Sequence, residues 1–404
     1  MTSVPMVGRD DDLATVDAAW RLLAAEPQRA RIVVVTGDAG AGKSRLVAEA
    51  VARLDPAPGL VLTGQSRAVG PAPYDWMASA LSGRPLDAVG VPDDALAWLT
   101  QRAESPARRF APEALLRAGV DAVRALQRGR PGVLVVEDLH DLDPASLDLV
   151  SELAVAADLP VLLLITSRSA AGLAARVLAR VSGTPRSTRR HLAPLGPADV
   201  AAALGRPASD EAVAAAHRRT GGNPFWLSEL VTTDALTGPP PAHLAAVAAD
   251  RVPAGALRVA RAAALLGEPV DTAALGRVCD DAEVGVDRLV AAGVLRLDGD
   301  GGLRFAYPVL AEGLAAGALP SLRTAVARVA GAVPDDGLLT ARERDVIRLL
   351  AAGRSNQQVA RALGISVRTV TVHVSNLLRK TGAASRTEAA LWAVRHGLAD
   401  RAPR

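Results

Sequence analysis

The octapeptide Gly-Asp-Ala-Gly-Ala-Gly-Lys-Ser at residues 37–44 limits the fold of this chain more than any other segment. It fits G-x-x-x-x-G-K-S, the pattern of a phosphate-binding loop between a strand and a helix. The β-branched apolar run Ile32–Thr36 before it predicts a buried strand, and Arg45–Leu54 after it predicts a helix. Glycines let the backbone wrap around phosphates, with amide groups and the helix N-terminus facing the anion. We therefore predict a loop that binds the phosphates of a nucleoside triphosphate.

The residues of this loop have separate expected roles. Lys43 should reach the β- and γ-phosphates, and Ser44 should hold Mg²⁺. Lys43 is one of only two lysines among 46 Lys and Arg residues, which suggests that the wider head of arginine does not fit here. The predicted cofactors are ATP and Mg²⁺. The loop residues predicted to bind them are Gly37, Gly40, Gly42, Lys43 and Ser44.

Two adjacent acids, Glu137 and Asp138, follow the apolar run Val133–Val136. A site for Mg²⁺ and a triphosphate needs one acid near the metal and another to orient or deprotonate water. Glu137 is the metal-side candidate, and Asp138 is the catalytic candidate on the water side. The alternative is that one acid only caps the next turn. Asp143, which precedes a proline, is predicted to be a helix N-cap without a chemical role.

Arg168 follows another apolar run, Val161–Thr166. At the end of such a strand, we expect its side chain to lie beside the γ-phosphate and to sense it. A plain surface arginine is the alternative.

Strand and helix patterns alternate over the first 170 or so residues, which favours a mostly parallel sheet covered by helices. The expected strands are Ile32–Thr36, Leu60–Thr63, Val133–Glu137 and Val161–Thr166, and Ser182–Arg190 is expected to be a polar loop. Helical patterns follow from Pro197 to about Thr233. Thr237–Pro241 is the clearest linker, because it is rich in proline and glycine. Beyond it, helices and a hairpin of Val294–Leu297 with Leu303–Tyr307 indicate a winged-helix-like module.

Composition narrows the class of protein. Hydrophobic residues make up 50% of the chain and charged residues 22%, which excludes a largely disordered protein. The single cysteine, Cys279, suits a reducing cytosol, and the sequence shows neither a signal peptide nor a membrane span. We therefore expect a cytoplasmic protein. Residues 338–404 hold 12 basic and 4 acidic residues, while the remainder holds 34 basic and 39 acidic. A basic C-terminal segment in an otherwise acidic chain is expected of a protein that contacts nucleic acid through that segment.

Residues 4–335 resemble the STAND class of AAA-like regulatory ATPases. Val7–Asp10 is similar to the adenine-side motif of that class, and Glu137–His140 is similar to its acidic metal-binding segment. Gly222–Pro224 resembles the G-x-P element of its helical lid, where Pro224 would pack on adenine. The resemblance implies a closed monomer with ADP and a self-associating form with ATP. Tyr307 stands where the family usually has histidine.

The basic C-terminal end carries the signals of four short helices. Thr340-x-x-Glu343, Ser355-x-x-Gln358 and Ser385-x-x-Glu388 are capping boxes, and Ser366 is a fourth N-cap. A glycine turn at Leu363–Ser366 joins the second and third helices, as in a helix-turn-helix. The third helix has an apolar side, for which Val370, Val374 and Leu377 are expected to face the core.

The opposite side of the third helix is predicted to read DNA in the major groove. Thr371 and Val372 are expected to contact thymine methyl groups, and Asn376 to read adenine. Arg368, Arg379 and Lys380 suit phosphates. A solvated polar face is the alternative for each base-edge residue. The complete predicted DNA-binding set is Arg368, Thr369, Thr371, Val372, Ser375, Asn376, Arg379 and Lys380.

Residues 339–389 resemble the LuxR-type DNA-binding domain. The resemblance rests on Gly353–Asn356, Ile365–Val370 and the pair Val372-His373. Many relatives carry lysine where Thr371 and Ser375 stand, so this chain should differ in sequence preference. The last helix, Arg386–His396, commonly pairs two such domains, which implies a dimer on a pseudo-palindromic site.

Together these patterns predict a multidomain chain. Its expected parts are an α/β P-loop NTPase core (1–175), a helical lid (176–236), a winged-helix-like module (242–333) and an all-α LuxR-type helix-turn-helix domain (338–404). The expected function is transcription regulation, in which the ATP or ADP state controls self-association and binding to promoter DNA. RNA polymerase is a further candidate partner. Hydrolysis is expected to be slow at most. The alternatives are an ATPase whose main output is turnover, and a DNA-binding protein whose nucleotide module is a fixed scaffold.

Overall fold

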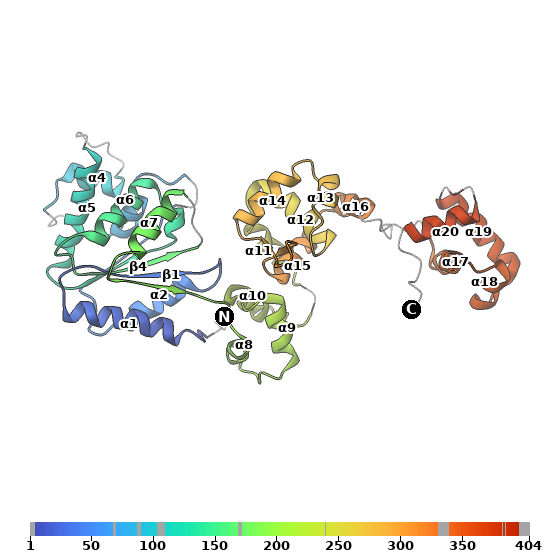
Figure 1. The fold of residues 1–404 in the computed structure, drawn as a ribbon, viewed down its shortest axis with the longest axis horizontal. Coiled ribbons are helices and arrows are strands. Elements are labelled where there is room, and N and C mark those ends of the chain that lie inside the picture. Colours follow the sequence, from blue (N-terminus) through green and yellow to red (C-terminus); the bar gives the residue numbers. More distant parts are fainter. Residues whose placement is uncertain are drawn as a thin grey trace. The chain divides into compact units, whose positions relative to one another are not determined.

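The computed structural model describes residues 5–67, 70–86, 90–102, 110–168, 172–238, 240–329, 339–381, 383 and 385–395. The chain divides into two compact units, residues 1–239 and 240–404 (Figure 1). The division falls within the proline-rich segment Thr237–Pro241. Two segments discussed above, residues 330–338 and 396–404, lie outside the described residues.

A parallel sheet of five strands forms the centre of the first unit, in the order β2-β3-β4-β1-β5. The strands are β1 Arg31–Thr36, β2 Leu60–Gly64, β3 Gly132–Val136, β4 Val161–Ser167 and β5 Ser187–His191. The four strands that the sequence predicts are confirmed. The prediction of a loop at Ser182–Arg190 is wrong in part, because residues 187–190 belong to β5. This strand pairs with β1 alone and has no buried residue, so it lacks the apolar run that marks the inner strands.

Helices cover both faces of this sheet, because alternate residues of each strand face opposite sides. On one face, Val33 and Val35 of β1 pack with Trp20 and Leu46 of two helices. On the other face, Val34 joins a larger core that includes the remaining helices around the sheet. Figure 1 shows α1 and α2 on one side and α4 to α7 on the other. The helices of this layered part are α1 Asp10–Ala25, α2 Lys43–Ala52, α3 Asp75–Leu81, α4 Asp93–Thr100, α5 Pro112–Gln127, η1 Leu139–Asp141, α6 Pro144–Val155 and α7 Gly172–Ser182.

Three further helices complete the first unit, as the helical pattern from Pro197 predicts. They are α8 Pro197–Leu204, α9 Glu211–Thr220 and α10 Pro224–Thr232. Val200, Val213 and Leu227 form a small core of their own, against which Val7 packs.

The strand register brings the predicted site residues to one edge of the sheet. Thr36 of β1 lies beside Ser167 of β4, and Val136 of β3 lies beside Ile165 of β4. The carboxyl ends of these three parallel strands therefore meet, which is where open α/β sheets place their ligands. The loop after β1, the acids after β3 and Arg168 after β4 all begin at this edge.

The second unit begins with a helical module that contains the predicted hairpin. Its strands, β6 Leu295–Leu297 and β7 Leu303–Phe305, pair antiparallel. The module's helices are α11 Leu244–Asp250, η2 Ala254–Ala256, α12 Leu257–Leu266, α13 Thr272–Val278, α14 Ala282–Ala291, α15 Pro308–Ala316 and α16 Pro320–Val329. In α12, the side chains of Val259, Ala260 and Ala263 are fully buried, so this helix lies at the centre of the module.

The described part of the basic C-terminal end folds into the four helices that its caps predict. They are α17 Ala341–Ala351, α18 Asn356–Leu363, α19 Val367–Thr381 and α20 Arg386–Arg395. Both predicted capping boxes at Thr340 and Ser355 are present. The hydroxyl of Ser366 accepts from the Thr369 amide at 3.1 Å, and that of Ser385 accepts from the Glu388 amide at 3.2 Å.

Candidate functional site

Two glycines determine the path of the loop between β1 and α2. Gly42 has a φ of 91° immediately before α2, and Gly40 has a φ of 79°. Both values lie in the left-handed region, where a residue without a Cβ is favoured. Space is limiting at Gly40 as well, because a Cβ there would lie 2.7 Å from the Cβ of Phe225. A side chain at Gly40 would therefore push the loop away from α10.

The ammonium group of Lys43 lies over this loop. Its Nζ donates to the carbonyl oxygens of Gly37 at 3.1 Å and Asp38 at 3.0 Å. Burial lowers the pKa of Lys43, and the carboxylate of Asp138 opposes this shift because it favours the charged form. The charge of Arg168 acts in the same direction as burial. Lys43, Asp138 and Arg168 thus lie within electrostatic reach of one another.

Ser44 and Glu137, which the sequence predicts as the metal-binding pair, contact each other directly. Ser44 Oγ donates to Glu137 Oε2 at 2.7 Å, and Thr166 Oγ1 donates to the same oxygen at 2.8 Å. Thr166 also accepts from the Asp138 amide at 2.9 Å. Sequence reasoning missed Thr166. Its hydroxyl connects the end of β4 to both acids, which becomes visible only when β3 and β4 are placed side by side.

The donor set of this pair suits a magnesium ion. Hydroxyl and carboxylate oxygens are its usual ligands, and Mg²⁺ is commonly held by one or two protein groups together with phosphates. Within the described ranges, no cluster of three or more His, Cys, Asp and Glu side chains could hold a metal ion. Ser44 and Glu137 therefore fit an ion that takes its other ligands from phosphates and water.

Arg168 is positioned by His140, which also lies near Asp138. Arg168 Nε donates to His140 Nε2 at 2.7 Å, and the Arg168 backbone amide approaches His140 Nδ1 at 3.3 Å. Burial lowers the pKa of His140 and so favours the neutral ring, which can accept from Arg168, although the nearby Asp141 acts in the opposite direction. The side chain of Asp138 is 47% exposed, and its Oδ1 lies 3.9 Å from His140 Nδ1. Sequence reasoning assigned no role to His140.

Helix α10 begins directly on the phosphate-binding loop. The Asn223 side chain accepts from the amides of Phe225 and Trp226 and so caps the helix, while its Nδ2 donates to the carbonyl of Ala39 at 2.9 Å. The Phe225 amide also approaches the carbonyl of Gly40 at 3.2 Å. Pro224, the residue that the sequence singles out, lies between these two contacts at the first position of the helix. Sequence reasoning missed the contacts of its neighbours Asn223 and Phe225, because the G-x-P spacing does not indicate what these residues contact.

A buried arginine links the N-terminal segment to the same region. Arg9 is 9% exposed, and its Nη2 donates to the carbonyl of Ala193 at 2.8 Å. Asp12 Oδ2 lies 3.9 Å from Arg9 Nη1, and Asp12 Oδ1 accepts from Arg190 Nε at 2.7 Å. Burial lowers the pKa of Arg9, and the carboxylates of Asp12 and Asp199 oppose this shift. The segment Val7–Asp10 therefore ties α1 to the chain that enters the α8–α10 bundle.

In the C-terminal unit, α19 has the two faces that the sequence predicts. Val370 and Leu377 are buried, and Val374 packs against the same core. The opposite face carries the residues predicted to contact DNA. Arg368, Thr369, Thr371, Val372, Ser375 and Arg379 are exposed, and Asn376 is half-buried. Val372 is 55% exposed, so its methyl groups are accessible on this face.

Lys380 differs from the other predicted DNA contacts. Its Nζ donates to Glu343 Oε2 at 2.7 Å, and its side chain is only 24% exposed. Burial raises the pKa of Glu343, but hydrogen bonds from Lys380 and Thr340 outweigh it and lower the pKa below its usual range. This ion pair joins α17 to α19, so a phosphate contact by Lys380 would compete with an internal contact.

Comparison with known protein families gives one match at the N-terminal end of the chain and one at the C-terminal end. Residues 5–165 match the AAA ATPase domain, and residues 337–393 match the luxR family of bacterial regulatory proteins. An uncharacterized transcriptional regulatory protein of Bacillus subtilis, YhcZ, is 55% identical over 60 residues, which are 15% of this chain and 28% of that protein. The response regulator protein VraR of Staphylococcus aureus is 44% identical over 61 residues, which are 15% of this chain and 29% of that protein. The match to this chain thus covers less than a third of the length of each of these relatives.

Solved structures that are similar to this chain include the Orc1 protein of Aeropyrum pernix in complex with DNA. It is 15% identical, has a TM-score of 0.44, and the match covers 80% of this chain and 93% of that chain. A STAND protein with a tetratricopeptide repeat sensor from Pyrococcus horikoshii is 14% identical with a TM-score of 0.37, over 98% of this chain and 57% of that chain. In the described part of the chain, no helix is both long and apolar enough to span a membrane.

The loop with Lys43 and Ser44 at the carboxyl edge of the sheet agrees with the first family match, and the capped helices α17 to α20 agree with the second. This chain therefore combines an N-terminal AAA ATPase domain with a C-terminal DNA-binding domain of the luxR family of bacterial regulators.

Proposed function

We propose that this regulator binds ATP with Mg²⁺, and that its nucleotide state controls self-association and binding to promoter DNA. The contact between α10 and the phosphate-binding loop carries this proposal. Asn223 and Phe225 bond to the carbonyls of Ala39 and Gly40, so the loop that would hold phosphates also holds the lid. Any change in the backbone of this loop is transmitted to α10 without an intermediate residue.

The residues at the edge of the sheet have the following proposed roles. Loop amides and Lys43 bind the phosphates, Ser44 and Glu137 hold Mg²⁺, and Pro224 packs near the base. Magnesium would supply neutralisation of phosphate charge. Asp138 is the proposed group that orients or deprotonates water, since its carboxylate is partly exposed and faces Lys43. Hydrolysis, where it occurs, serves to reset the regulator.

Arg168 is the proposed sensor of the γ-phosphate. Its guanidinium already contacts His140 and lies 3.8 Å from the carboxylate of Asp141. An anion beside Lys43 would draw the guanidinium from these partners. The position of Arg168 would then differ between the two nucleotide states.

Nucleotide acts here as a conformational ligand. A ligand shifts the equilibrium between two conformations of a protein only to the extent that its affinities for the two conformations differ. ADP is proposed to favour the lid contacts of Asn223 and Phe225, and ATP a form in which they are released. The lid leads through Thr237–Pro241 into the second unit.

The DNA-binding surface is proposed to be the exposed face of α19. Val372 and Thr371 would contact thymine methyl groups, and Asn376 would bond to adenine. The Thr371 hydroxyl bonds to the carbonyl of Val367 in its own helix, at 3.0 Å. Arg368 and Arg379 would bind phosphates. We further propose that α20 pairs two copies on a pseudo-palindromic promoter site, where RNA polymerase is a candidate partner.

Sedimentation of the full chain with Mg²⁺–ATP and with ADP tests this proposal. A larger assembly with ATP alone, lost in Lys43→Ala, is the expected result. Glu137→Gln provides a second variant, because it keeps an oxygen acceptor for Ser44 and Thr166 but removes the metal-binding charge. It should bind ADP and fail to assemble with ATP. Identical sedimentation with both nucleotides would support a fixed scaffold instead, and fast turnover unaffected by DNA would support an ATPase whose output is hydrolysis.

A further inference from the structure

One edge of the Arg168 guanidinium is turned toward the η1 turn. Arg168 Nε donates to His140 Nε2 at 2.7 Å, and Arg168 Nη2 lies 3.8 Å from Asp141 Oδ2. Nε and Nη2 lie on the same side of a guanidinium group, and their parallel N–H groups form the fork that binds carboxylates and phosphates. η1 therefore occupies the fork with which Arg168 would bind a phosphate.

His140 is the stronger of the two partners of this fork. Its side chain is 10% exposed, whereas that of Asp141 is 55% exposed and stays beyond hydrogen-bond distance of Nη2. An exposed ion pair contributes little, because water screens it. Burial lowers the pKa of His140, so the ring is uncharged at neutral pH and one of its nitrogens can accept a hydrogen bond. The buried imidazole is therefore the main contact that holds the guanidinium on η1.

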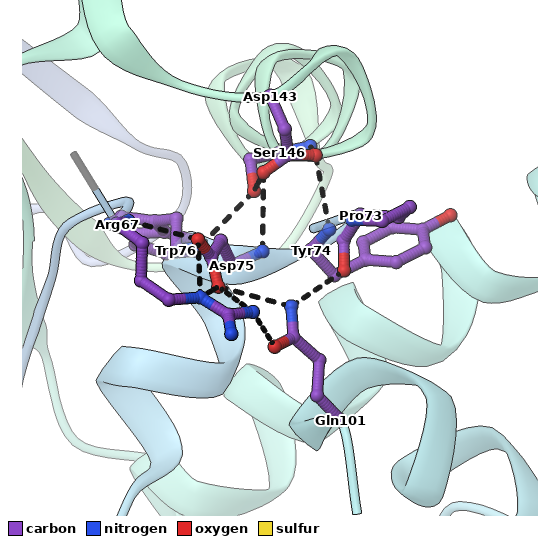
Figure 2. A network of polar contacts seen from close by, with 8 residues as sticks. All are labelled: Arg67, Pro73, Tyr74, Asp75, Trp76, Gln101, Asp143 and Ser146. Atoms are coloured by element: carbon purple, nitrogen blue, oxygen red, sulfur yellow. Dashed lines mark hydrogen bonds and ion pairs between the residues drawn. The ribbon is translucent and has the colours of Figure 1, made fainter. Parts of the chain in front are cut away.

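The segment that carries His140 is fixed on both sides. Before η1, the Asp138 amide donates to Thr166 Oγ1 at 2.9 Å. Just beyond η1, the buried carboxylate of Asp143 accepts from the amides of Tyr74 at 3.1 Å, Asp75 at 3.2 Å and Ser146 at 2.9 Å (Figure 2). The side chain of Arg168, in contrast, is 40% exposed. If the two groups separate, the guanidinium moves and the imidazole stays.

Arg168 also lies near the expected position of the γ-phosphate. Burial lowers the pKa of Lys43, and the charge of Arg168 lowers it further. The two cations are therefore within electrostatic reach, so a phosphate bound by Lys43 would also attract Arg168. A hydrogen bond between two charged groups is stronger than one to a neutral acceptor. A γ-phosphate would therefore take the fork of Arg168 from His140.

We propose that His140 is a positioning residue that holds the fork of Arg168 on η1 until a γ-phosphate replaces it, and that His140 thereby limits the preference of the chain for ATP over ADP. This inference rests on the proposed role of Arg168 as the γ-phosphate sensor. ATP must break the bond between Arg168 and His140, so this bond opposes ATP binding. ADP has no γ-phosphate and leaves the bond intact.

Calorimetric titration of the full chain with Mg²⁺–ADP and with Mg²⁺–adenylyl imidodiphosphate, an ATP analogue that resists hydrolysis, tests the proposal. His140→Leu removes the acceptor, and His140→Asn places its amide at the level of Nδ1, short of the guanidinium. Both should bind the ATP analogue about fivefold more tightly, the factor expected for one hydrogen bond. His140→Gln places an acceptor at the level of Nε2 and should restore the original affinity. Unchanged ADP affinity shows that each variant is folded.

Two further variants separate this role from a general loosening of η1. Arg168→Ala should weaken binding of the ATP analogue but not of ADP. In the double variant with Arg168→Ala, His140→Leu should no longer have an effect, because no guanidinium remains to be held. His373→Leu makes the same replacement on α19 of the second unit and should change neither affinity.

Weaker binding of the ATP analogue by His140→Leu would overturn the proposal, because His140 would then aim Arg168 at the phosphate. Equal changes for both nucleotides, or a glutamine variant that behaves like the leucine variant, would also overturn it. If Arg168→Ala keeps the original nucleotide preference, the proposed γ-phosphate sensor fails, and this inference fails with it. If Arg168→Ala loses the preference while His140→Leu changes nothing, only this inference fails.

Discussion

Replacement of Lys380 by methionine is expected to loosen the C-terminal helices more than it weakens phosphate contacts. Lys380 Nζ lies 2.7 Å from Glu343 Oε2, and the two side chains are 24% and 5% exposed. Methionine keeps the apolar stem of lysine but removes its charge. Glu343 is then left as a buried carboxylate without a cation.

The magnitude follows from this burial. Removal of one partner from a fully buried ion pair costs about 3–5 kcal/mol. Here Lys380 retains contact with water, and Glu343 keeps hydrogen bonds from Thr340 N at 2.8 Å and Thr340 Oγ1 at 3.0 Å. We therefore expect the free energy required to open α17 and α19 locally to fall by ~2 kcal/mol. Such a loss corresponds to roughly a 30-fold change in the opening equilibrium.

Hydrogen exchange of the full chain, followed by mass spectrometry on peptides of α17 and α19, measures this opening. Arg379→Met is the matched control, because Arg379 is the exposed neighbour of Lys380. The double variant Lys380→Met with Glu343→Gln should recover much of the lost protection, since it removes the buried charge. Equal protection in Lys380→Met and Arg379→Met would refute this reasoning. A fall of about one in the salt slope of DNA binding, caused by Lys380→Met alone, would instead assign Lys380 to a phosphate.

Three other predictions concern separate parts of the chain. Asn376→Ala should weaken specific DNA binding by ~1–3 kcal/mol and leave ATP affinity unchanged; unaltered binding to a selected promoter fragment would remove Asn376 from the readout. Asn223→Ala should cost about 1 kcal/mol as a lost N-cap and raise hydrogen exchange in α10, and unchanged exchange there would contradict the lid contact. The pKa of Glu343 is lowered in the folded chain, so its stabilisation is complete above the ordinary carboxyl value and disappears as the pH falls through the lowered value. Protection of α17 measured from neutral to acidic pH should therefore fall only at the acidic end, and a fall near neutral pH would exclude Glu343 as its cause.

Local signals account for the parts of the fold that were predicted correctly. The loop at Gly37–Ser44 follows from its own residues, because glycines and a lysine at fixed spacing have few other uses. The helices around Ser355 and Ser366 follow from caps that act over three residues. The inner strands are buried on both faces and therefore read as apolar runs.

The remaining features depend on contacts between distant residues. β5 is an exposed edge strand, so Ser187–His191 carries no apolar pattern. His140 gains its role only because β4 places Arg168 beside η1. Asp143 was correctly predicted as an N-cap, but its bonds to Tyr74 and Asp75, about seventy residues away, have no local signal. Lys380 is of a residue type that commonly contacts phosphates, but in the fold its side chain forms an internal ion pair with Glu343.

The most direct test of the central claim is the DNA affinity of the full chain under each nucleotide. A promoter fragment selected from genomic DNA by the protein itself would be titrated with Mg²⁺–ATP and then with ADP at the same salt concentration. We predict that the chain binds this fragment at least about tenfold more tightly with ATP than with ADP, a coupling of ~1.4 kcal/mol, and that Glu137→Gln binds it equally with both nucleotides. Equal affinity with ATP and ADP in the unaltered chain would contradict nucleotide control of DNA binding.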